Sequence, residues 1–130
     1  MPHTEQAKLV LVVDDDAQTR ESIRDALQRN RAIIAAVTDG RDALDFLEHD
    51  QPDAMIVNLE LQSLKGSVLV HALRSVGVLD RIPVIALTSV RGGTLPVSGQ
   101  GFACVLWQPV DLASLRAAVE RSLAMSVLRD

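Results

Sequence analysis

Cysteine and long hydrophobic runs are scarce in this 130-residue chain, and each shortage excludes a class of structure. A single cysteine, Cys104, rules out an intramolecular disulfide bond. The formal charge of -4 offers no basic surface for nucleic acid or for an anionic membrane. No apolar run approaches the roughly 20 residues that cross a bilayer, and residues 1–8 do not form a hydrophobic leader. We therefore expect a cytoplasmic protein with neither a nucleic-acid partner nor a membrane partner.

Short apolar runs recur along the chain, whose hydrophobic content is 48%. Runs that are apolar on both faces are typical of parallel strands buried between two layers of helices. The length suits one domain with one core, which we place at 1–130 with its core at about 8–125. The predicted strands are 9–13, 33–37, 54–57, 82–87 and 103–107.

Amphipathic segments of helical length separate these runs. Helices are expected after Asp16, over 39–49, over 66–76 and after Asp111, and both aspartates are suitable N-caps. Repeated β-α units require right-handed crossovers and a parallel sheet. The predicted fold class is therefore α/β: a flavodoxin-like (βα)5, doubly wound, five-stranded parallel sheet.

The segment between the fourth and fifth predicted strands departs from this β-α alternation. It contains Gly92, Gly93, Pro96 and Gly99. Each glycine costs a helix about 1 kcal/mol relative to alanine, and an interior proline costs about 3 kcal/mol. We predict that the fourth helix is absent or replaced by a loop.

Polar residues gather where the predicted strands end. In an open parallel sheet the working site lies beyond the carboxyl ends of the strands. Adjacent acids repel each other, so a divalent cation such as Mg²⁺ is one explanation for them, and simple solvation is the other. The strand-end residues are Asp14, Asp15, Asp16, Asn58, Thr88, Ser89 and Gln108.

Four segments, in this order and at this spacing, resemble the receiver domains of bacterial two-component response regulators. They are LVVDDD at 11–16, PDAMIVNLEL at 52–61 with Gly66 following, IPVIALTS at 82–89 and VLWQPVDL at 105–112. The resemblance covers residues 8–123. It implies an acid pair that binds Mg²⁺ and an aspartate ending the third strand that accepts a phosphoryl group from a histidine kinase. It also implies a Thr or Ser and a Lys that bind the new phosphate, and an aromatic residue on the fifth strand that reorients with the signal.

The chain matches this pattern at three positions and differs from it at three others. Asp14, Asp15 and Thr88 agree with the family. The phosphoacceptor position is Asn58, the lysine position is Gln108 and the aromatic position is Val105.

The change at Asn58 decides the expected chemistry. An acyl phosphate forms when a carboxylate oxygen attacks phosphorus, and a neutral amide oxygen is a poor nucleophile. The only lysines, Lys8 and Lys65, lie outside the fifth strand, so none replaces the family's lysine. One acid and one lysine are both absent, so the net charge of the site equals that of the family. We expect an unphosphorylated site with weak or absent Mg²⁺ binding at Asp14 and Asp15, and no other cofactor.

The fifth strand and the segment before it form the predicted partner surface, at about 90–107. Trp107 is either a core residue or an exposed interface residue, and exposed aromatics often anchor protein interfaces. The resemblance also implies a cis peptide bond between Gln108 and Pro109. The sequence leaves the partner and the oligomeric state open.

Two functions compete. The first is an atypical receiver-like signalling module of a phosphorelay pathway, which acts by protein–protein interaction and is not an enzyme. The alternative is a small phosphatase resembling the haloacid dehalogenase superfamily, with Asp14 and Asp16 in an Asp-x-Asp motif. An assay on a generic phosphomonoester separates the two.

Overall fold

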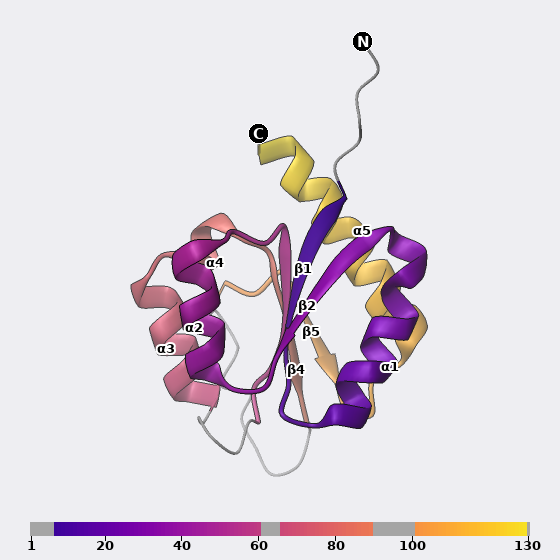
Figure 1. The fold of residues 1–130 in the computed structure, drawn as a ribbon, viewed down its shortest axis with the longest axis horizontal. Coiled ribbons are helices and arrows are strands. Elements are labelled where there is room, and N and C mark those ends of the chain that lie inside the picture. Colours follow the sequence, from indigo (N-terminus) through magenta and orange to yellow (C-terminus); the bar gives the residue numbers. More distant parts are fainter. Residues whose placement is uncertain (1–6, 61–65, 90–100, 130) are drawn as a thin grey trace.

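Five parallel strands form the centre of the molecule in the computed structural model, which describes residues 7–60, 66–89 and 101–129 (Figure 1). The strands follow the order β2-β1-β3-β4-β5 across the sheet. This arrangement confirms the predicted flavodoxin-like sheet. Their bounds are β1 Lys8–Val13, β2 Ala32–Val37, β3 Ala54–Asn58, β4 Val84–Thr88 and β5 Cys104–Trp107.

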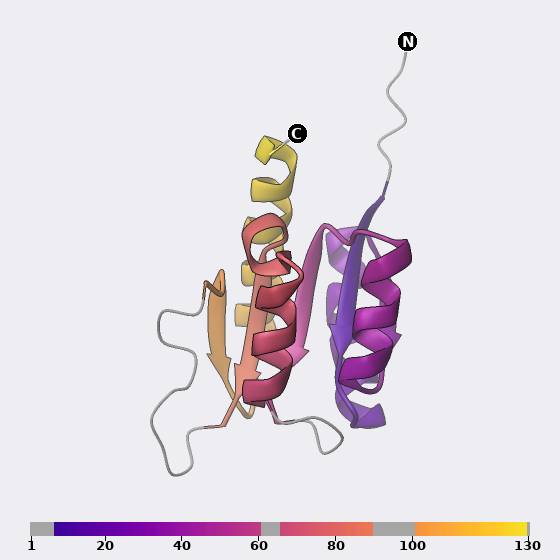
Figure 2. The ribbon, with the colours of Figure 1, turned by 90° about the vertical axis from the view of Figure 1, so that its left-hand side faces the viewer.

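Helices cover both faces of the sheet. The helices α1 (Ala17–Leu27) and α5 (Leu112–Arg129) pack on one face, and a 3-10 turn, η1 (Gln28–Asn30), follows α1. The helices α2 (Gly40–His49), α3 (Gly66–Ser75) and α4 (Val78–Arg81) pack on the other. Figure 2 looks onto the face with α3, and α5 lies behind the sheet. The chain is therefore doubly wound, as the β-α alternation predicted.

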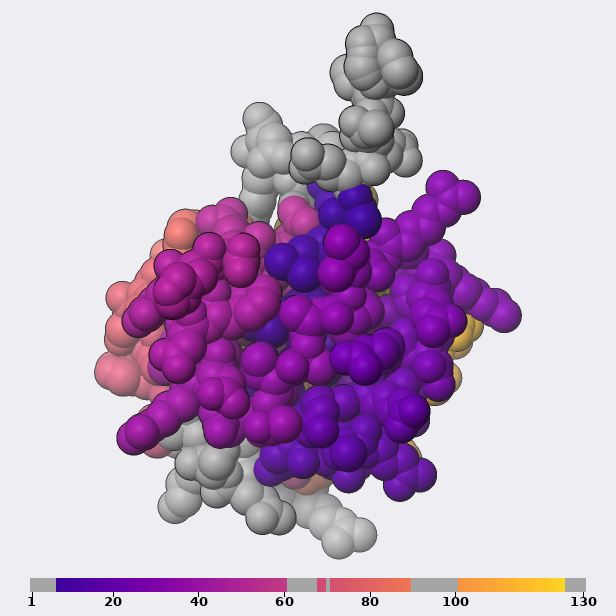
Figure 3. Space-filling view, viewed as in Figure 1, coloured from indigo at the N-terminus to yellow at the C-terminus, as the bar shows by residue number. Residues whose placement is uncertain are grey.

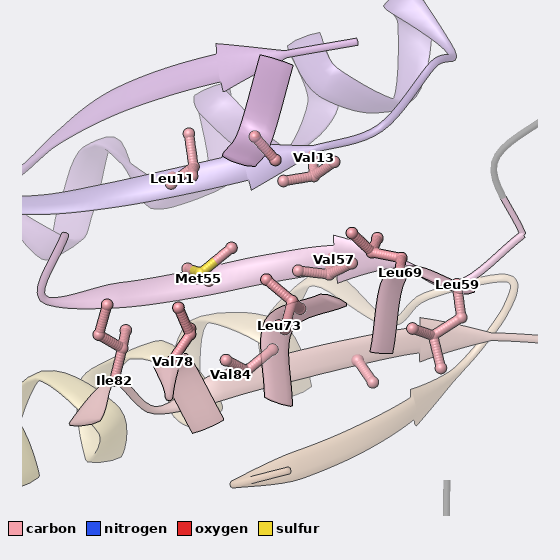
Figure 4. Close-up of a cluster of buried hydrophobic side chains, with 12 residues drawn as sticks. Leu11, Val13, Met55, Val57, Leu59, Leu69, Leu73, Val78, Ile82 and Val84 are labelled. Atoms are coloured by element: carbon pink, nitrogen blue, oxygen red, sulfur yellow. The ribbon is translucent and has the colours of Figure 1, made fainter. Parts of the chain in front are cut away.

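Side chains alternate between the two faces of the sheet along each strand, and they form one hydrophobic core on each face. Leu11 and Val13 of β1 face the α2–α3 side, while Val10 and Val12 face the α1–α5 side. Period-2 alternation with both faces covered is the reason that these strands are apolar throughout. Figure 4 shows the first core, in which side chains of β1, β3 and β4 meet those of α3 and α4.

The sheet edges are less protected than its centre. Figure 3 views the β2 side, where α1, β2 and α2 form the near surface, and Ile33 of β2 is exposed. At the other edge, Trp107 is 40% exposed, so its interpretation as a core residue is wrong. Cys104 is partly buried beside the α1–α5 core.

Both predicted N-caps, Asp16 and Asp111, are confirmed, and one helix was missed. Asp16 accepts hydrogen bonds from Thr19 at the start of α1, and Asp111 accepts them from Ser114 at the start of α5. The four-residue helix α4 was not predicted, because it is too short to show periodicity; Gly77 precedes it with a φ of 76°, which suits glycine. β4 begins at Val84, two residues later than expected.

The sequence predicted that the helix between β4 and β5 is absent or replaced by a loop. That prediction concerns a different segment from the α4 of Figure 1, which precedes β4. Residues 90–100 lie outside the described residues, so that prediction stays a prediction. Among the described helices, none combines the length and the apolar character of a membrane span.

Candidate functional site

Asp14 lies directly beyond the end of β1 and is completely buried, with 0% of its surface exposed. Its carboxylate accepts hydrogen bonds from the backbone N–H of Asp16 at 2.9 Å and from the side-chain amide of Asn58 at 3.3 Å. Burial raises the pKa of Asp14, and the nearby Asp15 and Asp16 add to this, while the two hydrogen bonds oppose it. Asp14 is therefore a buried carboxyl group held by neutral donors.

Asn58 ends β3 and is 8% exposed. Its Nδ2 donates to Asp14, and its Oδ1 accepts a hydrogen bond from the backbone N–H of Glu60 at 2.8 Å. The amide can be oriented in only one way, because the reverse orientation would face the amide group toward an N–H and the carbonyl toward a carboxylate. An aspartate could accept from Glu60, but it has no hydrogen to offer Asp14. Asn58 thus satisfies both neighbours, whereas an aspartate here would satisfy only Glu60.

A second polar group joins β3 to β4. The side chain of Glu60 accepts hydrogen bonds from the Thr88 hydroxyl at 3.2 Å and from the backbone N–H of Ser89. Glu60 is an exposed residue whose slight desolvation acts to raise its pKa, but the donors from Ser89 and Thr88 outweigh this and hold that pKa below its ordinary value. Sequence reasoning missed Glu60. The available signal was its place two residues after Asn58, beside the end of the neighbouring strand.

Asp15 and Asp16 are exposed, unlike Asp14. The carboxylate of Asp16 is engaged as the N-cap of α1, and hydrogen bonds from Thr19 lower its pKa. A phosphatase with an Asp-x-Asp motif needs an accessible carboxylate nucleophile, and here Asp14 is enclosed. The phosphatase alternative therefore finds no support in this geometry.

The β5–α5 connection brings Gln108 to the same edge of the sheet. Its backbone N–H donates to the Thr88 carbonyl at 2.8 Å, and the Gln108–Pro109 peptide bond is cis, as expected. A pocket of about 510 Å³ lies between this connection and the first turns of α1, and Asp14, Asn58 and Gln108 line it. Val105 is partly buried against the α2–α3 core.

The donor set around Asp14 differs from what Mg²⁺ requires. Mg²⁺ binds oxygen ligands in an octahedral arrangement, yet both Asp14 oxygens accept N–H groups, and Asn58 turns its nitrogen toward Asp14. Within the described part of the chain, no cluster of three or more His, Cys, Asp or Glu side chains is arranged to hold a metal ion. The residues as arranged do not fit a bound divalent cation, and weak or absent Mg²⁺ binding remains a prediction.

The raised pKa of Asp14 predicts the pH dependence of stability. Because the folded state holds this proton more tightly than the unfolded state, Asp14 causes stability to fall as pH rises from about 4 through its raised pKa. The free energy of unfolding of Asp14→Asn, taken relative to that of the wild type, should therefore rise across that pH interval and stay constant above it. Urea titrations at several pH values measure this difference, and a parallel pH dependence in the two proteins would contradict it.

Comparison with known proteins agrees with this fold. The family model for the response regulator receiver domain matches residues 10–120. The response regulator MprA of Mycobacterium ulcerans is 33% identical over 93% of this chain and 52% of its own length. MprA of Mycolicibacterium vanbaalenii is 40% identical over 62% of this chain and 34% of its own length. The chain thus spans about half, or less, of the length of these relatives.

Solved structures share the fold. The receiver domain of Francisella response regulator 1452 superposes with a TM-score of 0.81 at 23% identity, covering 92% of this chain and 98% of that one. The signal receiver domain of a signal transduction histidine kinase from Syntrophus aciditrophicus gives a TM-score of 0.79 at 26% identity, with 91% of each chain covered.

Proposed function

Because this chain belongs to the response regulator receiver domain family, we propose that it is an atypical receiver that signals without phosphorylation at the usual position. Receiver domains are signalling modules of two-component pathways, and they act on signalling partners. The proposal concerns how this member does so: by protein–protein interaction, in a state that does not depend on an aspartyl phosphate at position 58.

The bridging role of Asn58 carries the proposal. Its amide lies between the Asp14 carboxylate and the Glu60 N–H, and both ends of the amide are used. A neutral amide cannot form a stable acyl phosphate. The hydrogen bonds also give Asn58 a structural reason to be there, because it joins the ends of β1 and β3 without adding a charge next to buried Asp14.

Gln108 supports the same interpretation, that this site is not phosphorylated. A lysine at this place would be positioned to neutralise a phosphoryl group, and without that anion it would be a partly desolvated cation. Gln108 is neutral and lines the pocket above Asn58. The acceptor and its cationic partner are therefore both replaced by amides, which suits a site that has no phosphoryl chemistry to perform.

The surface around β5 is the proposed docking region, at about 90–107. β5 pairs only with β4 among the described strands, and Trp107, its last residue, is exposed. A partly exposed tryptophan provides a large apolar contact area at little entropic cost. Residues 90–100 belong to this proposed region but lie outside the described residues, so its support comes from β5. We also propose that this part of the molecule does not bind nucleic acid.

Incubation with acetyl phosphate and Mg²⁺ tests the proposal. The intact mass of the wild type should stay unchanged, because position 58 offers no carboxylate. The matched variant Asn58→Asp, Gln108→Lys restores both groups on the same scaffold, and it should gain the mass of one phosphoryl group.

A phosphoryl group on the wild type would overturn the proposal, and peptide mapping would then start at Asp14, Asp15 and Asp53. If the double variant folds, by circular dichroism, and is labelled while the wild type is not, the unreactive result reflects Asn58 and Gln108 and not a damaged domain.

A further inference from the structure

Glu60 occupies a place that the proposed function leaves unexplained. It follows Asn58 by two residues, and its carboxylate reaches across to the end of β4. There it accepts hydrogen bonds from the Thr88 hydroxyl and the Ser89 backbone N–H. Thr88 is 4% exposed, so its hydroxyl has little access to water and Glu60 provides it with an acceptor.

The backbone brings Glu60 to this position. Asn58 lies opposite Leu87 in the sheet, and the N–H of Leu59 continues the pairing by donating to the Leu87 carbonyl at 2.9 Å. The Glu60 N–H then turns back to the Asn58 side chain. Leu59 and Glu60 form a turn after β3, in which the Leu59 side chain is buried while the exposed Glu60 side chain reaches the polar end of β4.

The chemistry of this contact is that of anion binding. A hydroxyl and a backbone N–H, both donors, meet on one carboxylate oxygen, Oε2. Hydrogen bonds to a charged acceptor are about twice as strong as neutral ones. The lowered pKa of Glu60 agrees with an ionised carboxylate at neutral pH. In the family that this chain resembles, the Thr or Ser at the position of Thr88 binds the phosphoryl group.

We propose that the Glu60 carboxylate is a built-in anion that binds the Thr88 hydroxyl and the Ser89 N–H in place of a phosphoryl group. The inference rests on the proposed function, since it explains how a receiver without an aspartyl phosphate satisfies these two donors. Asn58 contributes by holding the backbone of Glu60, so the hydrogen bonds run continuously from Asp14 through Asn58 to Glu60 and on to Thr88. Glu60 is thus a positioning residue for the end of β4.

Hydrogen exchange and the chemical shift of the Ser89 amide in the full chain test this directly. In Glu60→Ala, the Ser89 N–H loses its charged acceptor and should exchange at least about tenfold faster, with an upfield shift of its proton. Glu60→Gln keeps a neutral acceptor and should fall between Ala and the wild type. Glu21→Ala on α1, an exposed glutamate far along the chain, should leave Ser89 unchanged.

A second measurement uses the restored acceptor. In the Asn58→Asp, Gln108→Lys background, removal of Glu60 frees Thr88 and Ser89 for the phosphoryl group. The fraction labelled by acetyl phosphate at a fixed time should therefore rise several-fold in the triple variant with Glu60→Ala.

The outcomes separate this inference from the proposed function. An unchanged Ser89 amide in Glu60→Ala overturns the inference, whatever the phosphorylation assay shows. Equal labelling of the double and triple variants also overturns it, while the proposed function stands as long as the wild type remains unlabelled. Labelling of the wild type, by contrast, overturns the proposed function.

Discussion

Asn58→Asp alone should lower the free energy of unfolding by about 2–4 kcal/mol at neutral pH, judged from the interaction of two charges about 4 Å apart at an effective dielectric constant near 20. The substitution replaces the amide donor, which lies 3.3 Å from Asp14 Oδ2, with a second carboxylate oxygen. Asp14 is fully buried, so solvent screens this repulsion poorly. A carboxylate at position 58, which the proposed function treats as the missing phosphoacceptor, is therefore expected to destabilise this site.

The pH dependence identifies charge as the cause. Two neighbouring carboxylates raise the pKa of at least one of them, so the stability lost as pH rises through that raised pKa should return as pH falls. Asn58→Ala is the charge-free control, because it also removes the hydrogen bond to Asp14, together with the one from the Glu60 N–H, and adds no charge. The loss of unfolding free energy in Asn58→Ala, relative to the wild type, should therefore change little with pH.

Mg²⁺ and Gln108→Lys should each reduce the stability loss caused by Asn58→Asp, because each provides a positive charge at the site. Thermal unfolding with and without Mg²⁺ measures the first effect, and a ligand that binds only the folded state raises the melting temperature. The wild type should show little response to Mg²⁺. The explanation fails if Asn58→Asp is as stable as the wild type at neutral pH.

Leu115→Ala should destabilise the fold by about 2–5 kcal/mol, the usual range for a large-to-small change in a core. Leu115 lies on α5, is 0% exposed and belongs to the core cluster on the α1–α5 side of the sheet. Its loss leaves a cavity among rigid neighbours that close only partly around it.

Met125, on the same helix, is the matched control for Leu115. Its side chain is 44% exposed, so Met125→Ala should cost less than about 1 kcal/mol. Urea unfolding followed by circular dichroism measures both variants. Similar losses for the two substitutions would contradict the assignment of one core face to α5.

The fold was predictable because its determinants are local and repeated. Strands such as Ala54–Asn58 are apolar at almost every position, and this indicates burial on both sides before any contact is known. Asp16 and Asp111 marked helix starts because a capping carboxylate acts within three residues of itself. The helix α4 escaped prediction because four residues give no periodicity to detect.

The site was only partly predictable. The positions of Asp14, Asn58, Thr88 and Gln108 followed from the rule that parallel strands end at one edge of the sheet. Their hydrogen bonds did not follow, because residues such as Asn58 and Asp14 lie 44 positions apart and meet only through strand register. Glu60 is the clearest case, since its place two residues after Asn58 indicates nothing about its partners until β4 lies beside it. The exposure of Trp107 likewise depends on its place at the edge of the assembled sheet.

By itself, the sequence determined the parallel α/β fold and the kinship with receiver domains, and it placed Asn58 at the end of the third strand. These properties depend on residue type and on spacing along the chain. Only the tertiary structure decided that Asp14 is buried with neutral donors, that Asn58 joins Asp14 to Glu60, and that Glu60 binds Thr88 and Ser89. Those properties depend on distances between separate strands, which only the packing of the sheet sets.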